Sequence, residues 1–157
     1  MRNWNFLDLA LGILICGVLA ALPLTAQSKK TQAQSLVDLT AQKHSEIATL
    51  EISAAPEGQE HCSTIAATEA KDLGEKCDDD EAAALKTMEP VVEHEPDGFD
   101  VTAPLHDASG KLVGALGIDF KPQAGQTKAD IVKRTAKLLR DMELQIPSKA
   151  FLFQLVP

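Results

Sequence analysis

The chain has 157 residues, which is enough for one domain with a hydrophobic core of its own. Aspartate and glutamate number 23 against 15 lysines and arginines, so the formal net charge is −8, and aromatic residues make up 4% of the chain. We expect no nucleic-acid partner and no docking on an anionic membrane surface, because both need a basic face.

The first 26 residues have the pattern of a cleavable secretory signal peptide. Arg2 supplies positive charge, an apolar run from Leu9 to Leu22 follows without a charged residue, and Leu24-Thr25-Ala26 ends the segment. A short apolar run closed by small residues is typical of a signal that directs export and is then removed. We therefore predict a signal peptide over residues 1–26 and a periplasmic or secreted protein.

Two other interpretations of this segment stay open. One is an uncleaved membrane anchor, because the apolar run falls only somewhat short of the roughly 20 residues that a membrane span prefers. The other is a lipoprotein signal at Cys16, although Ile15 stands where a small residue is wanted. No second apolar stretch of this kind follows in the sequence, so we predict that residues 27–157 form a single domain outside the cytoplasm.

Cys62 and Cys77 are the cysteines that follow the leader. An even pair in an exported chain is typical of a disulfide, because compartments outside the cytoplasm are oxidising. Closing that loop would constrain the unfolded chain by about 3 kcal/mol. We predict a Cys62–Cys77 disulfide, with two free thiols, or metal ligation together with His61, as the alternatives.

Hydrophobic periodicity and turn signals divide the rest of the chain into helices and strands. The helical pattern predicts helices over residues 28–45, 78–88 and 127–146. The strand-like pattern predicts strands over residues 47–53, 62–68, 91–94, 99–105 and 111–120. Residues 72–76 have the composition of a loop, and the apolar tail 150–156 predicts a last strand or a packed extension.

Acidic and hydroxyl residues mark the beginnings of the two later helices. The run Asp78-Asp79-Asp80-Glu81 suits the positive end of a helix dipole. Calcium binding is the alternative, but the calcium loop spaces its ligands at alternate positions and these are consecutive. Thr127 and Asp130, three residues apart, predict a capping arrangement at the start of the last long helix.

The order of elements predicts the fold class. Tight turns at 95–98 and 107–110 separate the three late strands and favour antiparallel pairing. Helices covering one face of an antiparallel sheet give an α+β arrangement with an N-terminal and a C-terminal helix. Gly114 and Gly117, inside the last strand, predict a bend or close packing against another backbone.

This order of elements, together with the stretch 101–118, resembles the extracytoplasmic PAS-like sensor domains of the Cache family. Pro104 ends a strand, a turn over Asp107 to Gly110 follows, and the next strand carries Val113-Gly114-Ala115-Leu116. The resemblance covers about residues 30–122 and implies a five-stranded antiparallel sheet, with a C-terminal helix and tail over 127–157. The residues that carry the resemblance form turns and packing contacts, so they indicate a fold and do not identify a ligand.

The same resemblance implies a ligand pocket between the sheet and the loop-helix segment that covers it. Typical ligands of the family are small carboxylates, amino acids and similar metabolites. Members usually lie between two membrane spans and feed an output domain, whereas this sequence shows no second span and no output module. A free-standing binding protein, or a subunit that reports to a membrane sensor partner, is therefore the better expectation.

Candidate ligand-binding residues follow from position alone. His94, Asp100 and Thr102 lie on the late strands, and His61 and Lys71 lie near the covering loop. We interpret Asp100 and Asp119 as solvent-facing strand residues and not as a catalytic pair.

Metal binding is a separate hypothesis, because histidine, thiolate and carboxylate together can bind zinc or copper. No pair of histidines has a recognised metal-binding spacing, and His61 with His94 is the pair most worth testing.

No catalytic constellation and no cofactor motif is found: Gly-x-Ser-x-Gly, a phosphate-binding loop and Cys-x-x-Cys-His are all absent from the sequence. We therefore predict a non-enzymatic, sensor-like module, without a cofactor, that binds a carboxylate or amino-acid-like ligand. Two alternatives remain. One is a periplasmic metal-buffering protein that uses His and Cys residues, and the other is an interaction subunit without a ligand. In either the sensor or the subunit, the N-terminal helix could pair two copies into a homodimer.

Overall fold

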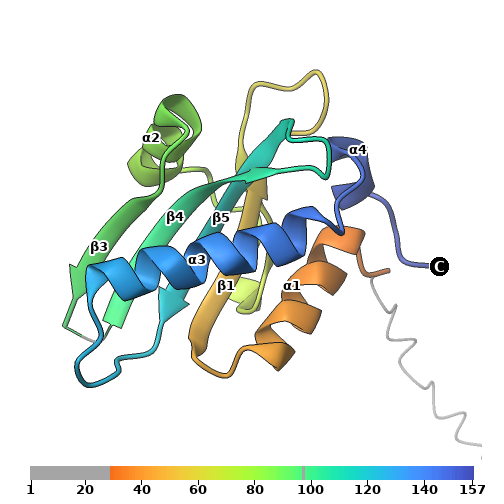
Figure 1. Ribbon diagram of the computed structural model, residues 1–157. Helices are drawn as coiled ribbons and strands as arrows, with labels where there is room; N and C mark the ends of the chain where they lie inside the picture. Colours follow the sequence, from red (N-terminus) through yellow and green to blue (C-terminus); the bar gives the residue numbers. More distant parts are fainter. Residues whose placement is uncertain (1–28, 97) are drawn as a thin grey trace, which may run out of the picture.

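The computed structural model describes residues 29–96 and 98–157, in which four α-helices, five strands and a 3₁₀ turn follow one another along the chain (Figure 1). In chain order they are α1 (Gln32–Lys43), β1 (Ile47–Ala54), β2 (Ser63–Ala67), η1 (Ala70–Asp72), α2 (Asp79–Thr87), β3 (Val91–Glu95), β4 (Gly98–His106), β5 (Leu112–Phe120), α3 (Lys128–Glu143) and α4 (Lys149–Leu152). The expected cleavage after Ala26 lies outside the described residues.

The five strands form one antiparallel sheet in the order β2-β1-β5-β4-β3. The α+β class and the five-stranded antiparallel sheet predicted from the sequence are therefore confirmed. β5 pairs with both β1 and β4, so the first and last strands of the chain lie next to each other at the centre of the sheet. The backbone of Gly114 approaches Ser53 so closely that a Cβ there would collide with the Ser53 carbonyl oxygen, which confirms the close packing predicted at that glycine.

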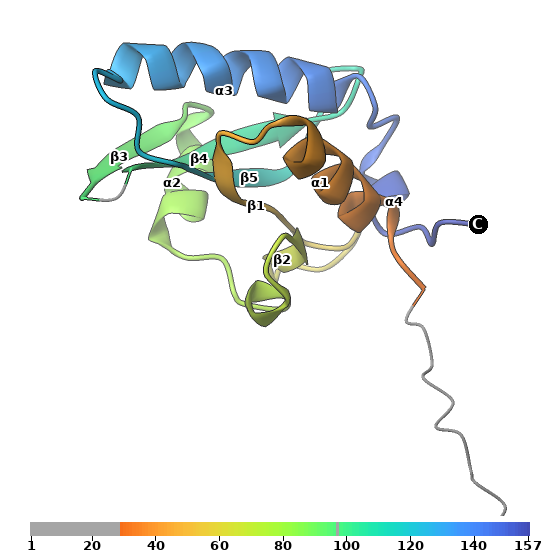
Figure 2. The same ribbon diagram turned by 90° about the horizontal axis from the view of Figure 1, so that it is seen from below.

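Helices α1, α3 and α4 cover one face of the sheet, and α2 covers part of the other. Figure 2 shows α3 on one side of the sheet and α2 on the other. The main core lies on the α3 side, where the helical stripe of α3 meets alternate residues of β1, β4 and β5. Its fully buried side chains include Leu50, Ile52, Val101, Leu105, Leu116, Ile118, Ile131, Met142 and Ile146.

Both later helices begin with a capping box, which was predicted for α3 only. Asp78 accepts hydrogen bonds from the backbone N–H groups of Asp80 and Glu81, and Glu81 accepts one in return from Asp78, so the acidic run forms a capping box at the start of α2. Thr127 and Asp130 form the predicted cap of α3. Both arrangements satisfy N–H groups that a helix end otherwise leaves without partners.

The C-terminal region differs in detail from the sequence prediction. Helix α3 ends at Glu143, three residues earlier than predicted. The backbone turns after Glu143, and the Ile146 side chain is nevertheless fully buried in the core. The tail forms the short helix α4 and a single antiparallel bridge between Leu155 and Thr31, in place of a full strand. The Val156 N–H donates to the Lys30 carbonyl, so the two ends of the domain lie side by side. Among the helices that the structure describes, none has both the length and the apolar composition needed to span a membrane.

Candidate functional site: an acidic cleft between the sheet and the η1–α2 segment

A cleft of about 270 Å³ opens on the α2 side of the sheet. Its floor comes from alternate residues of three neighbouring strands, which are Thr49, Glu51, Asp100, Thr102, Gly117 and Asp119. Its wall comes from η1, the loop after it and the first turn of α2, namely Glu69, Lys71, Asp72, Glu75, Asp78 and Glu81. The site therefore lies between the sheet and the covering loop-helix segment, where the PAS-like resemblance implies a pocket.

Strand register brings two of the floor carboxylates together. Asp119 of β5 pairs with Asp100 of β4 on one side and lies opposite Thr49 of β1 on the other. The Thr49 hydroxyl donates a hydrogen bond to Asp119 Oδ2. Directly paired residues of adjacent strands hold their side chains close together, so Asp100 and Asp119 face the same small space.

The interpretation of Asp100 and Asp119 as solvent-facing residues was therefore wrong. Both side chains are partly buried, because the η1–α2 segment covers their face of the sheet. Burial, followed by the negative charge of Asp119, raises the pKa of Asp100 to about 6. Desolvation and a neighbouring like charge both disfavour the ionised carboxylate.

Glu51 occupies the middle of the floor, above a glycine. A Cβ on Gly117 would lie 2.7 Å from Glu51 Cγ and 2.8 Å from its Oε1, so the missing side chain makes room for the glutamate. Burial is the main cause that raises the pKa of Glu51 to about 7, and the charges of Glu81 and Asp72 add to it. Glu51 therefore changes its charge close to neutral pH.

Glu81 connects the wall of the cleft to the sheet through hydrogen bonds. Its side chain is buried, and its Oε1 accepts a hydrogen bond of 2.9 Å from the Ser53 hydroxyl on β1. Its Oε2 accepts from the Asp78 backbone N–H at 2.6 Å. Burial is also the largest cause that raises the pKa of this carboxyl group.

The cleft is strongly acidic as a whole. Eight carboxyl groups line it, and Lys71 is the single cationic side chain among its lining residues. Lys71 Nζ is already paired, at 2.9 Å from Glu69 Oε2, and its side chain is 75% exposed. Such a surface attracts cations and repels anions.

The five predicted ligand-binding residues fall into two groups. Lys71, Asp100 and Thr102 line the cleft, so the structure brings these three together. His94 lies on the opposite face of the sheet, because side chains alternate along β3, and its ring contacts that of Phe99 with a centroid distance of 4.6 Å and an interplanar angle of 50°. His61 is exposed in the loop before β2 and is not among the cleft-lining residues.

Sequence reasoning missed Glu51 and Glu81, and it predicted a bend or close backbone packing at Gly117, which instead lies against the Glu51 side chain. A signal for Glu51 was present, because Thr49 and Glu51 alternate with the apolar Leu50 and Ile52 and must share one face of β1. Glu81 gave no comparable signal, since an acidic first turn is normally exposed to water.

The structure gives no support to a metal centre. Within residues 29–96 and 98–157, no group of three or more His, Cys, Asp and Glu side chains is arranged to hold a metal ion. Cys62 and Cys77 lie at disulfide distance, with Cα atoms 5.4 Å apart, as the sequence predicted. His44 and His106 each contact a single glutamate, through Glu46 and Glu143 respectively.

The sequence matches no known family model and no curated protein. Several solved structures are similar to this chain in fold. The second GAF domain of DevS from Mycobacterium smegmatis has a TM-score of 0.56 at 14% identity, over 72% of this chain and 89% of that one. The GAF domain of the Acinetobacter phosphoenolpyruvate-protein phosphotransferase has a TM-score of 0.53 at 15% identity, over 76% of this chain and 82% of that one.

An enzyme shares the same fold. The type II free methionine-R-sulfoxide reductase from Thermoplasma acidophilum has a TM-score of 0.52 at 18% identity, over 80% of this chain and 94% of that one. The fold therefore does not decide between a binding domain and an enzyme, and the absence of enzymatic activity stays a prediction. At these identities the comparisons bear on architecture alone. The prediction of a PAS-like fold is confirmed, because the chain has the PAS-like fold of GAF domains. The more specific resemblance to Cache domains stays a prediction.

Proposed function

We propose that this protein is a non-enzymatic, sensor-like module that binds a small, positively charged organic molecule in the cleft between the sheet and the η1–α2 segment. The observation that carries the proposal is the cleft itself, a space of about 270 Å³ at the position where a PAS-like domain has its pocket. Concave sites with a few converging polar groups are the usual form of a small-molecule site.

The charge of the lining selects the class of ligand. A carboxylate ligand, as expected from the Cache resemblance, would face eight carboxyl groups and one lysine that already contacts Glu69. The Coulomb energy of two unit charges about 4 Å apart is about 4 kcal/mol at an effective dielectric constant of about 20. It is repulsive between two anions and attractive between an anion and a cation. A ligand with an ammonium group gains this interaction, so an amine or a cationic amino acid suits the cleft better than a simple carboxylate.

The proposal includes a location and a role. We propose that the protein acts outside the cytoplasm and reports ligand binding to a membrane partner. The N-terminal sequence pattern supports export, and a cysteine pair at disulfide distance is in keeping with an oxidising compartment. Neither alternative function gains a specific supporting observation. The metal-buffering role would need free cysteines, and the ligand-free subunit would need a collapsed pocket.

Titration calorimetry with two matched four-carbon probes tests the proposal. We expect 1,4-diaminobutane to bind and succinate not to bind. At about pH 8, where Glu51 is ionised, Glu51→Gln should weaken diamine binding by about tenfold, because the floor loses a charged carboxylate. Glu57→Gln removes the same charge from an exposed loop outside the cleft and should leave the affinity unchanged. Binding of succinate in preference to the diamine, or of neither probe, would contradict the proposal.

A further inference from the structure

The wall of the cleft belongs to a hairpin-like segment, residues 62–77, whose base is closed by the cysteine pair. β2 leads away from Cys62, η1 forms the tip, and residues 74–77 return beside β2. The Thr64 N–H donates to the Glu75 carbonyl at 2.9 Å, the Gly74 N–H donates to the Thr64 carbonyl at 2.9 Å, and the Cys77 N–H donates to the Cys62 carbonyl at 3.3 Å. Cys62 and Cys77 are 15 residues apart in sequence, with their Cα atoms 5.4 Å apart.

The tip of this segment is the part that reaches the cleft. Glu69, Lys71, Asp72 and Glu75 line the cleft from the segment, and Asp78, the next residue after Cys77, lines it from the cap of α2. The floor comes instead from β1, β4 and β5, of which β5 pairs with both β1 and β4. The cross-link therefore acts on one side of the site only.

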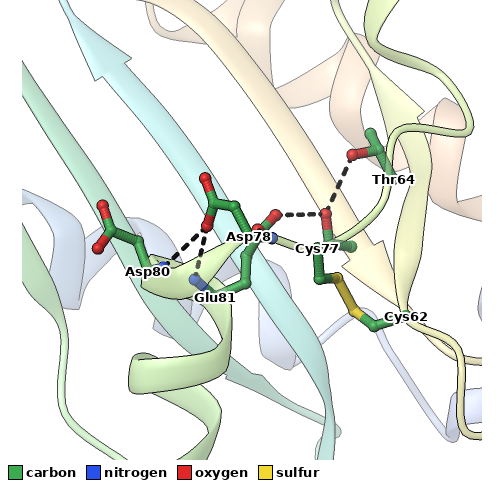
Figure 3. The surroundings of a disulfide bond; sticks show 7 residues. Cys62, Thr64, Cys77, Asp78, Asp80 and Glu81 are labelled. Carbon is green, nitrogen blue, oxygen red and sulfur yellow. Dashed lines mark hydrogen bonds between the residues drawn. A yellow bond between two sulfur atoms is a disulfide. The ribbon is translucent and has the colours of Figure 1, made fainter.

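A second attachment holds the base of the segment to the sheet. Glu81, in the first turn of α2, accepts from the Ser53 hydroxyl of β1, which lies 3.2 Å from the Thr64 hydroxyl of β2. Figure 3 shows this chain of contacts beside the disulfide, with Asp78 and Glu81 following Cys77. Without the disulfide, the returning residues 74–77 would be held by the short ladder to β2 and by Glu81. Short ladders at an exposed edge open locally more easily than central strands do.

We propose that the Cys62–Cys77 disulfide positions the wall of the cleft, so that ligand affinity depends on the thiol–disulfide state of this pair. The inference rests on the proposed function, because it assumes that the cleft binds a ligand. Both cysteines are partly exposed, so a dithiol reductant reaches them. In the reaction two electrons and two protons pass from the dithiol to the protein. The S–S bond breaks, two thiols form on Cys62 and Cys77, and the reductant becomes a disulfide. The freed segment then samples positions in which the tip no longer faces the floor.

The first test compares the purified protein in its oxidised form with the same protein reduced by dithiothreitol. We expect 1,4-diaminobutane to bind about tenfold more weakly to the reduced form, a coupling of ordinary size for two linked sites. Hydrogen exchange of the amides in residues 74–81 should become faster on reduction, while exchange in β4 and β5 should not change. The Cys62→Ser/Cys77→Ser variant should behave like the reduced protein and should not respond to dithiothreitol.

A second test needs no variant and no isolated reduced protein. Linkage is reciprocal, so a ligand that prefers the oxidised form must stabilise the disulfide by the same factor. In a dithiothreitol redox buffer, saturating 1,4-diaminobutane should shift the thiol–disulfide equilibrium about tenfold toward the disulfide, and succinate should leave it unchanged.

The outcomes separate the two proposals. Equal diamine affinity in both redox states, together with an unshifted redox equilibrium, would overturn the inference and leave the proposed function standing. Absence of diamine binding to the oxidised protein would overturn the proposed function, and the redox dependence of affinity would fall with it.

Discussion

The two faces of the sheet are built from the same strands, but they carry different side chains: one face is apolar and the other carries carboxyl groups. On the α3 side, Leu50, Leu116 and Ile118 are fully buried in a continuous apolar core. On the α2 side, Glu51 and Asp119, each next in sequence to one of these core residues, bring carboxyl groups into a partly covered cleft. One face thus stabilises the fold by burial. The other keeps carboxyl groups at a cost, because desolvation disfavours their charged forms.

Because the two faces are separate, residues of the site can change without loss of the fold. Period-two alternation lets a residue of the cleft face change while its neighbours keep their places in the core. The comparison predicts that substitutions on the two faces separate cleanly into effects on stability and effects on binding.

The apolar face should respond most strongly to truncation. Leu116→Ala removes a fully buried side chain, and we expect the free energy of unfolding to fall by about 3 kcal/mol, because such truncations leave a cavity. Urea denaturation followed by circular dichroism measures the loss. Thr102→Ala, on the cleft face of the neighbouring strand, is the control and should cost no more than about 1 kcal/mol. Similar losses in the two variants would contradict the division of the sheet.

Removal of the disulfide should come next. Cys62→Ser/Cys77→Ser frees a loop of about 15 residues, and we expect the free energy of unfolding to fall by roughly 3 kcal/mol, mainly because the unfolded chain gains entropy. Chemical denaturation of the variant, compared with the oxidised parent, gives the difference. A loss well below about 1 kcal/mol would mean that the pair constrains the unfolded chain less than its spacing predicts.

Filling the space above Gly117 should affect ligand affinity more than the stability of the fold. In Gly117→Ala the new Cβ would collide with Glu51 Cγ and Oε1, so the glutamate must take another rotamer, and we expect the free energy of unfolding to fall by no more than about 1 kcal/mol. The displaced carboxylate should weaken 1,4-diaminobutane binding by roughly fivefold, a loss of about 1 kcal/mol. Calorimetric titration and a thermal melt of the same sample separate the two effects. Unchanged affinity would show that the position of Glu51 is not important to the site.

The last effect concerns pH. The pKa of Glu51 is raised to about 7 and that of Asp100 to about 6, so the folded protein holds protons that the unfolded chain releases. Their contribution to stability is therefore present below about pH 4 and is lost as the pH rises through about 6 to 7. Urea midpoints should fall over this range, while diamine affinity should rise as the floor becomes charged.

A variant isolates the glutamate in this pH effect. Glu51→Gln should flatten the upper part of the pH dependence, and Glu57→Gln should leave it unchanged. The carboxyl groups of Glu46 and Asp107, whose pKa values are lowered by hydrogen bonds, act in the opposite direction at lower pH. A pH profile of Glu51→Gln that matches the parent would contradict the assignment to Glu51.

The fold could be predicted because its signals are local. The capping residues of α3, the tight turn between β4 and β5 and the helical stripe of α3 each act within a few residues, and the structure contains all of them. The tail was less predictable, since a short apolar segment suits a strand, a helix or an extension equally.

The site was only partly predictable, because it depends on contacts distant in sequence. Asp100 and Thr102 alternate along β4 and therefore share one face, but no local pattern tells which face a second layer will cover. That missing information made Asp100 and Asp119 look solvent-exposed, and it suggested that His94 lay beside the cleft. Glu81 joined the site only because α2 folds back onto β1 and β2 through Ser53 and Thr64.

We propose that the α2 side of the sheet, and not the α3 side, is the binding face for a small organic cation. A titration of isotope-labelled protein with 1,4-diaminobutane, followed by amide chemical shifts, distinguishes the two faces. We expect saturable shifts at Glu51, Asp100, Gly117 and Asp119 and in residues 69–81, with little change along α3 and none with succinate. Shifts centred on α1 or α3, or the same shifts with succinate, would contradict it.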